Sequence, residues 1–174
     1  MARNTCLLVL MFGAAALYVS GAMAQVPAAV AAPGVTKVAT FQAEGAQIYE
    51  CKPGSDGKLS WVFREPIATL LFDGKTVGRH YAGPTWEDVD GSAVTGKVVG
   101  NAPGATMNDI PWLKLDVVSH RGSGTFANVI TVQRLDTHGG AAQGACDKAG
   151  TFRSVPYSAT YIFLRKPDTE GVAR

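Results

Sequence analysis

From residue 37 onward the chain consists of short apolar segments separated by turn residues, and several of these segments alternate apolar with polar side chains. Leu113, Leu115 and Val117, for example, alternate with Lys114 and Asp116. Alternation at every second position is typical of a β-strand that buries one face. Segments of this kind predict eight strands: 46–52, 59–64, 67–72, 76–81, 92–99, 112–119, 126–135 and 157–165.

Two of these segments carry further predictions about their faces. In 126–135, Ile130 and Val132 are assigned to the apolar face and Arg134 to the opposite one. In 157–165 both faces are apolar, which indicates a strand that is covered on both sides. Between two of the other segments, the dipeptide Asp73-Gly74 is a strong hairpin signal.

No segment beyond the N-terminal leader shows a helical pattern, and the 20 glycines and 9 prolines favour turns over helices. The sequence therefore predicts one all-β domain over residues 37–166, either a β-sandwich or a barrel of about eight strands. Residues 25–36, rich in Ala, Pro and Val without a period, are predicted to form a flexible arm. Residues 167–174 form a polar tail.

The N-terminus has the pattern of a cleavable signal peptide over residues 1–24. Arg3 precedes an apolar run from Cys6 to Val19, and Ala22-Met23-Ala24 offers a small-residue cleavage site. We therefore expect cleavage after Ala24, a secreted or periplasmic location, and no membrane span in the mature chain.

The charge balance limits the classes of partner. The chain has 16 Lys and Arg against 14 Asp and Glu, a formal net charge of +2. This near-neutral balance argues against a nucleic-acid-binding protein, which would need a strongly basic face. A small molecule or a glycan is therefore the expected partner. The charge balance does not predict the oligomeric state.

Cysteine usage agrees with export. Once Cys6 leaves with the leader, Cys51 and Cys146 are the two cysteines of the mature chain. In an oxidising compartment they are expected to pair in a disulfide. A reactive thiol pair or a soft-metal site are the alternatives, but neither cysteine belongs to a C-x-x-C motif.

The chain contains an ordered set of short motifs spread over roughly residues 36–165. They are Gln47-Ile48-Tyr49-Glu50-Cys51, Trp61-Val62-Phe63, His80-Tyr81-Ala82-Gly83-Pro84-Thr85-Trp86-Glu87, Ile110-Pro111-Trp112-Leu113, Gln133-Arg134-Leu135-Asp136-Thr137-His138-Gly139-Gly140 and Val155-Pro156-Tyr157. In this set the chain resembles an exported family of unknown activity, DUF3455. The resemblance implies export and a single domain, while it implies no activity.

Residues 80–92 are the strongest candidate for a functional segment, because they combine a histidine, aromatic residues and three acids with turn residues. We expect a shaped loop there, and such loops often carry binding groups. The candidate binding residues are His80, Tyr81, Trp86, Glu87 and Asp90. Of the three tryptophans, Trp86 is expected to be partly exposed, where its ring would stack on a sugar or another flat ligand. In the competing interpretation the aromatic residues only cap the core.

Two functional classes remain open from the sequence. The preferred one is a non-enzymatic ligand-binding domain. The alternative is a metal-assisted hydrolase in which His80 acts as a base with Glu87 or Asp90 as its partner. If His80, His120 and His138 converged, they would suit a zinc or copper ion. No nucleophile stands beside a base in the sequence, which is why the binding hypothesis is preferred.

Overall fold

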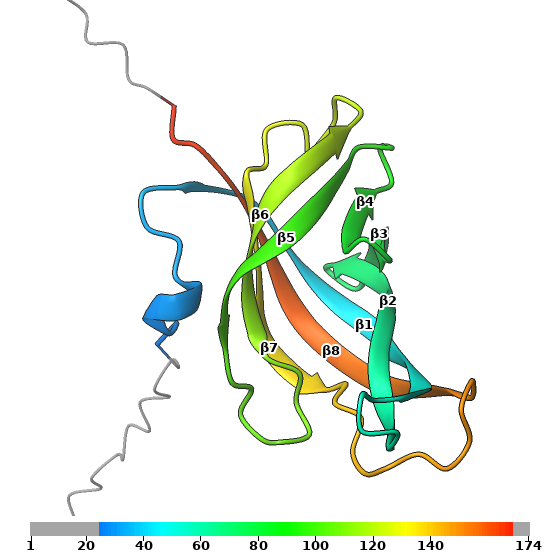
Figure 1. The fold of residues 1–174 in the computed structure, drawn as a ribbon. Coiled ribbons are helices and arrows are strands. Elements are labelled where there is room, and N and C mark those ends of the chain that lie inside the picture. The colour runs from blue at the N-terminus through cyan, green and yellow to red at the C-terminus, as the bar shows by residue number, and fades with distance from the viewer. Residues whose placement is uncertain (1–24, 169–174) are drawn as a thin grey trace, which may run out of the picture.

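The protein forms a closed barrel in which each strand pairs antiparallel with the next and β1 pairs with β8 (Figure 1). The structure is a computed structural model that describes residues 25–168. The predicted all-β fold of about eight strands is confirmed, as a barrel. The strands are β1 (Thr36–Pro53), β2 (Leu59–Phe72), β3 (Lys75–Tyr81), β4 (Thr85–Asp88), β5 (Ala93–Ala102), β6 (Trp112–Arg121), β7 (Thr131–Gly139) and β8 (Phe152–Arg165).

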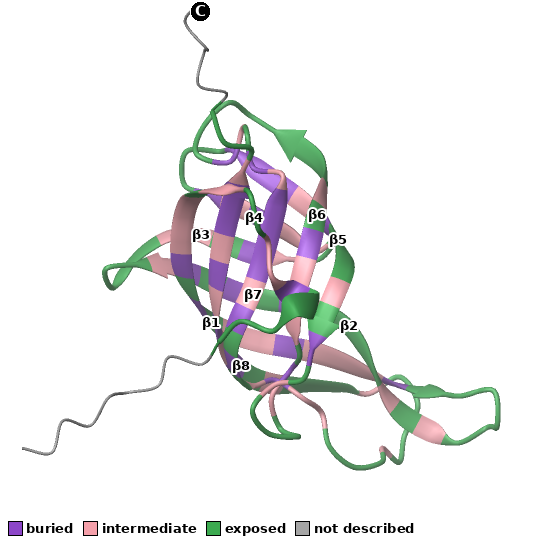
Figure 2. Ribbon diagram, turned by 90° about the vertical axis from the view of Figure 1, so that its left-hand side faces the viewer, coloured by how far each residue is buried: buried purple, intermediate pink, exposed green. Residues whose placement is uncertain are grey.

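Buried and exposed residues alternate along the strands, so that one face of each strand lines the barrel interior (Figure 2). At one end of the barrel the interior is filled by aromatic rings. Phe126, which is fully buried, stacks on Phe163 with a centroid distance of 4.3 Å, and Phe41 packs against both rings. This closed end carries the β6–β7 connection, which supplies Phe126 and Val129 as its plug.

The structure corrects several predicted boundaries. β1 begins at Thr36 rather than at residue 46, and β8 begins at Phe152 rather than at residue 157. Segment 126–135 is a strand only from Thr131, because residues 126–129 turn inward to close the barrel. Segments 59–64 and 67–72 form one strand, β2, which continues through Pro66. Proline is tolerated there because the β1–β2 pairing is interrupted next to it, with Arg64 as the extra residue of a bulge.

Residues 80–92 are not the loop that the sequence predicted. They contain the end of β3, the whole of β4 and two tight turns, so that His80 lies directly opposite Trp86 in the β3–β4 pair. The turn between these strands is compact, with a cis peptide bond between Gly83 and Pro84. The four residues of β4 are enough to hold this hairpin in the barrel wall.

The expected flexible arm is packed against the barrel over part of its length. A short 3-10 turn, η1 (Ala28–Val30), places the fully buried Val30 against Ala102 and Leu135. The side chain of Gln133, which faces outward from β7, donates a 2.6 Å hydrogen bond to the Val30 carbonyl oxygen. The arm therefore covers part of the outer wall instead of extending into solvent.

The predicted disulfide is confirmed. Cys51 and Cys146 are bonded, with Cα atoms 5.9 Å apart and 95 positions apart in sequence. The bond ties the end of β1 to the long β7–β8 connection. Backbone hydrogen bonds of 2.9 Å from Cys51 N to Thr151 O and from Gly150 N to Cys51 O hold the same junction.

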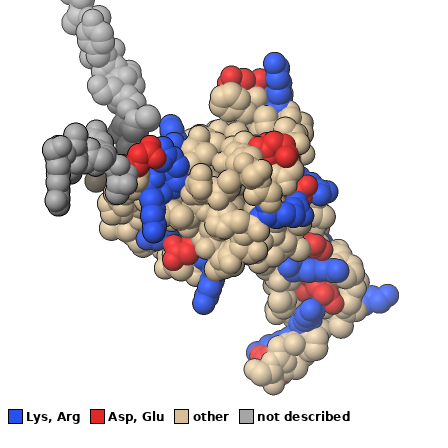
Figure 3. Space-filling model, turned by 90° about the horizontal axis from the view of Figure 1, so that it is seen from above, with Lys and Arg blue, Asp and Glu red and all other residues tan. Residues whose placement is uncertain are grey.

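The predicted signal peptide, residues 1–24, lies outside the described residues, as does the end of the polar tail from 169. Within residues 25–168, no helix has the length and the apolar character that crossing a membrane would require. On the face seen from the closed end, basic and acidic side chains are interspersed around a mostly uncharged centre (Figure 3).

Candidate functional site

A cavity of about 540 Å³ occupies the barrel interior on the side away from the aromatic plug. Most of its lining is apolar. The residues that line it are Gln47, Tyr49, Phe63, Arg64, Pro66, His80, Gly83, Pro84, Trp86, Val98, Ile110, Pro111, Leu113, Leu115, Arg134 and Tyr161.

The opening of this cavity follows from the shortness of β3 and β4. β3 pairs with β2 only over Ala68–Phe72, and β4 pairs with β5 only over Ala93–Thr95. The remaining halves of β2 and β5 therefore flank the β3–β4 turn without a strand between them. Phe63 of β2 and Val98 of β5, 51% and 46% exposed, line the cavity at this gap.

His80 and Trp86 form an aromatic wall of the cavity. Their rings stack 4.5 Å apart and 6° from parallel, and Tyr161 meets both rings edge-on. Gly96 makes room for the indole, since a Cβ there would lie 3.1 Å from Trp86 Cζ3. Trp86 is only 1% exposed, so the prediction that it would be partly exposed at the surface is wrong; it faces the cavity instead.

Burial keeps His80 neutral. It lowers the pKa of His80 to about 3, an effect that a hydrogen bond with Thr85 partly opposes and the charge of Arg134 reinforces. His80 Nδ1 lies 2.9 Å from the Thr85 carbonyl oxygen. Because that oxygen only accepts, Nδ1 carries the hydrogen and Nε2 carries the lone pair.

Arg134 is the charged residue of the inner cavity. It lies on β7 opposite Leu113 and Tyr161, which both face the interior. Its Nε and Nη2 donate hydrogen bonds of 3.1 and 2.9 Å to the Pro111 carbonyl oxygen. The assignment of Arg134 to the face opposite Val132 is wrong, because residues two apart on a strand share a face.

Two buried hydrogen-bond donors of the cavity have no partner among the described residues. They are Gln47 Nε2 and Trp86 Nε1, in side chains that are 2% and 1% exposed. The hydroxyl groups of Tyr157 and Tyr161 lie 3.4 Å apart in the same region, and burial raises the pKa of both. A buried donor without an acceptor costs free energy, so this part of the cavity suits a ligand that accepts hydrogen bonds.

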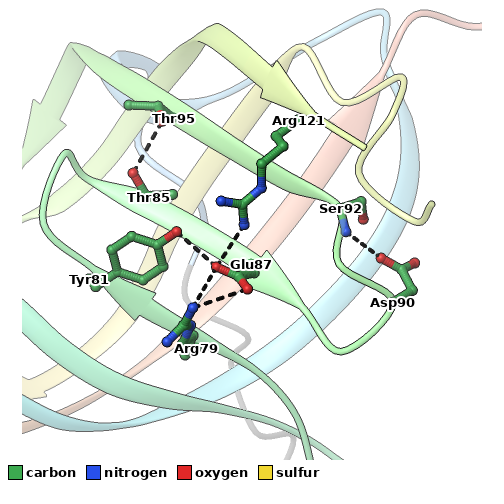
Figure 4. Close-up of polar contacts among 8 residues, drawn as sticks. All are labelled: Arg79, Tyr81, Thr85, Glu87, Asp90, Ser92, Thr95 and Arg121. Atoms are coloured by element: carbon green, nitrogen blue, oxygen red, sulfur yellow. Dashed lines mark hydrogen bonds and ion pairs between the residues drawn. The ribbon is translucent and has the colours of Figure 1, made fainter. Parts of the chain in front are cut away.

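The other candidate residues of the 80–92 segment lie on the outside of the barrel. Tyr81 donates a 2.8 Å hydrogen bond to Glu87, and Arg79 and Arg121 pair with the same carboxylate at 3.0 and 2.8 Å (Figure 4). Hydrogen bonds from Tyr81, Arg121 and Arg79 lower the pKa of Glu87 to about 2. These contacts join β3, β4 and β6 across the outer surface.

Replacing Glu87 with Gln will lower the free energy of unfolding at pH 7 by about 1 kcal/mol or less, because exposed ion pairs stabilise weakly. The Glu87 carboxylate stabilises the fold fully above its ordinary pKa of 4.5, and this contribution is lost as the pH falls toward 2. Urea unfolding at pH 7 and pH 3 measures both effects. Glu44→Gln, on the exposed face of β1, is the matched control, and an equal loss in the two variants would contradict the role of the network.

Asp90 holds the β6–β7 connection in place at the closed end of the barrel. One of its carboxylate oxygens accepts hydrogen bonds from the backbone N and the hydroxyl of Thr125 at 2.7 and 2.8 Å, and the other accepts from Ser92 N at 2.8 Å. Ser92 Oγ accepts from Phe126 N at 3.1 Å. Hydrogen bonds from Ser92 and Thr125 hold the pKa of Asp90 well below its usual range. Asp90 therefore positions the plug and lies away from the cavity.

The histidine-metal hypothesis fails on geometry. His80 lies inside the barrel, whereas His120 and His138 are exposed on β6 and β7. Within residues 25–168, no group of three or more His, Cys, Asp or Glu side chains is placed to hold a metal ion. Glu87 and Asp90 face away from His80, so the structure does not bring together the acid–base pair of the hydrolase hypothesis either.

A family model described as "Protein of unknown function (DUF3455)" matches residues 31–75 and 72–165. The chain belongs to this family. No curated protein and no solved structure matches the chain. The DUF3455 match includes the whole barrel and every residue that lines the cavity.

Sequence reasoning on this DUF3455 chain found His80 and Trp86 but missed Gln47 and Arg134 as cavity residues. The period-two pattern would have found Arg134, because Val132 is buried on the same face. Gln47 falls within one of the family's motifs, yet nothing in its neighbours indicates that it faces inward.

The other two tryptophans are not among the residues that line the cavity. Trp61 is half-buried near the disulfide, and Arg153 lies 5.8 Å above its ring. Trp112 packs on the outer cluster around Val30.

Proposed function

We propose that this protein is a non-enzymatic binding protein that holds one small, largely apolar organic molecule inside its barrel. The main observation in support is the 540 Å³ cavity, in which an apolar and aromatic lining surrounds two buried hydrogen-bond donors without partners. Cavities that bind small molecules typically measure about 300–1,000 Å³ and combine an apolar lining with few polar groups. Eight-stranded barrels have interiors just large enough for side chains or one small ligand.

The lining favours an aromatic or aliphatic ligand body over a sugar. Most of the surface that a ligand would touch is hydrocarbon, supplied by Phe63, Pro84, Val98, Ile110, Leu113 and Leu115. A sugar would bring a ring of hydroxyl groups, each of which needs a hydrogen-bond partner when buried. The proposal therefore keeps the small-molecule part of the sequence-based hypothesis and moves its site from the surface to the interior.

We further propose that the protein acts outside the cytoplasm, either secreted or in the periplasm. Two features support this location: the signal-peptide pattern of residues 1–24 and the Cys51–Cys146 disulfide. Structural disulfides persist mainly in oxidising compartments. A carrier or sensor of small molecules fits such a compartment.

Filling the cavity tests the binding proposal. Leu113→Trp adds an indole to the cavity lining, whereas Val118→Trp adds the same group to the exposed outer surface of the same strand. We expect 2-naphthalenemethanol, a neutral aromatic probe, to bind the wild type and the Val118 variant equally. The Leu113 variant should bind at least about tenfold more weakly, which corresponds to about 1.4 kcal/mol.

Isothermal titration calorimetry measures these affinities, and thermal unfolding confirms that each variant is folded. Equal binding to all three proteins would place the probe outside the cavity. No binding to the wild type by the neutral probe or by its carboxylate analogue would contradict the proposal.

A further inference from the structure

We infer that the cavity selects an organic carboxylate, and that Arg134 binds the carboxylate group while the apolar lining holds the rest of the ligand. This inference rests on the proposed function and specifies its ligand class. It derives from the balance of charge and of hydrogen-bond donors and acceptors in the inner cavity.

The charge of the lining is positive; Arg64 is paired with Glu65 at 3.2 Å, whereas Arg134 has no counterion among the described residues. Among the described residues that line the cavity there is no Asp or Glu, and the two charged side chains are Arg64, at the β2 bulge, and Arg134. Arg134 forms no salt bridge within residues 25–168. His80 is neutral because burial lowers its pKa to about 3, so Arg134 provides the one full charge beside the aromatic wall.

The contacts of Arg134 leave its charge unbalanced. Its hydrogen bonds of 3.1 and 2.9 Å go to a neutral acceptor, the Pro111 carbonyl oxygen, and the Tyr161 hydroxyl is a further neutral partner. The guanidinium also lies close enough to Tyr157 and Tyr161 to oppose the rise that burial causes in their pKa values. Phenol and carbonyl oxygens orient a guanidinium but carry no negative charge. A half-buried cation in such a setting gains most from an anion that brings its own charge into the cavity.

The neighbouring polar groups include two buried donors for which the described residues offer no acceptor. Gln47 Nε2 and Trp86 Nε1 are buried without partners, and the hydroxyl groups of Tyr157 and Tyr161 are close to each other. Tyr161 links these groups, because it contacts the Trp86 ring at a centroid distance of 5.3 Å and lies opposite Arg134 in the β7–β8 pair. A carboxylate only accepts, through two oxygens with about four sites, which complements these two donors.

The planar guanidinium also favours a carboxylate over a neutral acceptor. Arginine binds carboxylates through parallel, charge-assisted hydrogen bonds that are about twice as strong as neutral ones. An amide or alcohol would satisfy one unpartnered donor but leave the charge of Arg134 unbalanced. The ligand class is therefore an acid with an aromatic or aliphatic body that fits within about 540 Å³.

The test compares two probes with the same ring system, 2-naphthoate and 2-naphthalenemethanol, by calorimetry at pH 7. We expect the wild type to bind the naphthoate about 10- to 100-fold more tightly, the range for hydrogen bonds to charged groups. Arg134→Met, which keeps most of the aliphatic stem, should remove this preference and change the alcohol's affinity by less than about threefold. Lys114→Met removes a positive charge from the neighbouring position of β6 and should change neither affinity.

Each outcome separates this inference from the proposed function. If the wild type binds both probes equally, or if Arg134→Met weakens both equally, the carboxylate inference is overturned and cavity binding stands. If neither probe binds, the proposed function fails with it. If Lys114→Met weakens naphthoate binding as much as Arg134→Met does, the effect is long-range attraction and the inference is overturned. The wild-type preference needs no variant, so the test holds even if Arg134→Met does not fold.

Discussion

Removing the disulfide will lower the free energy of unfolding by about 4 kcal/mol. The bond joins residues 95 positions apart, and in the chain-entropy model a loop of that length stabilises a fold by about 4 to 5 kcal/mol. The double variant Cys51→Ala, Cys146→Ala should therefore unfold at a much lower urea concentration than the wild type. Urea unfolding followed by tryptophan fluorescence measures the change.

A reductant separates the loss of the bond from the loss of the sulfur atoms. Cys51 is fully buried, so its truncation also removes some packing. The wild type in dithiothreitol loses only the bond and should show most of the 4 kcal/mol, whereas the double variant should not respond to the reductant. If dithiothreitol lowers the free energy of unfolding of both proteins equally, or lowers that of the wild type by less than about 1 kcal/mol, the disulfide does not stabilise the fold as its loop length predicts.

Acidification from pH 6.5 to 4.5 will destabilise the protein by about 2 kcal/mol through one side chain, His80. The unfolded chain binds a proton at His80 near pH 6.5, but the folded protein does so only near pH 3. The free energy of unfolding is therefore highest above pH 6.5, where His80 is neutral in both states. It decreases as the pH falls toward 3, because the unfolded chain then binds a proton that the folded protein does not. Each pH unit in this window costs up to about 1.4 kcal/mol. Unfolding free energies measured at half-unit pH intervals give the slope.

His80→Phe is the variant that tests this assignment, because it keeps an aromatic ring against Trp86 and cannot titrate. It should be less stable than the wild type at pH 7 and nearly independent of pH between 6.5 and 4.5. Titration of Glu87 changes the free energy of unfolding mainly below pH 4.5, outside this window. His138→Gln, at an exposed position, should keep the wild-type slope. A slope that persists in the His80 variant would assign the effect to another group.

The fold was largely readable from the sequence because a β-strand repeats every two residues. The eight predicted segments correspond to parts of seven strands, and the Cys51–Cys146 pair followed from the cysteine count and the expected oxidising compartment. β4 was missed because its four residues are bracketed by turns at Gly83-Pro84 and Asp90-Gly91. Four residues are too few for alternation to be visible.

The site was only half predictable, because its residues meet through barrel closure rather than through nearness in sequence. His80 and Trp86 are paired neighbours, so one segment pointed to both. Arg134 and Gln47 come from β7 and β1, which contribute to the same cavity only because β8 joins both in the closed barrel. The chemistry of three other residues also predicted a binding role, yet their contacts stabilise the outer wall and the plug; these residues are Tyr81, Glu87 and Asp90.

The pairing of the first strand with the last has a consequence for how the protein is made. β1 pairs with β8 from Thr36 to Glu50, and residues of both strands line the cavity. During synthesis, β8 is the last of the described strands to appear, so the barrel cannot close before that. Until then the edge of β1 that pairs with β8 has no partner strand. Closure of the barrel, and with it the cavity, therefore waits until β8 is available to pair with β1.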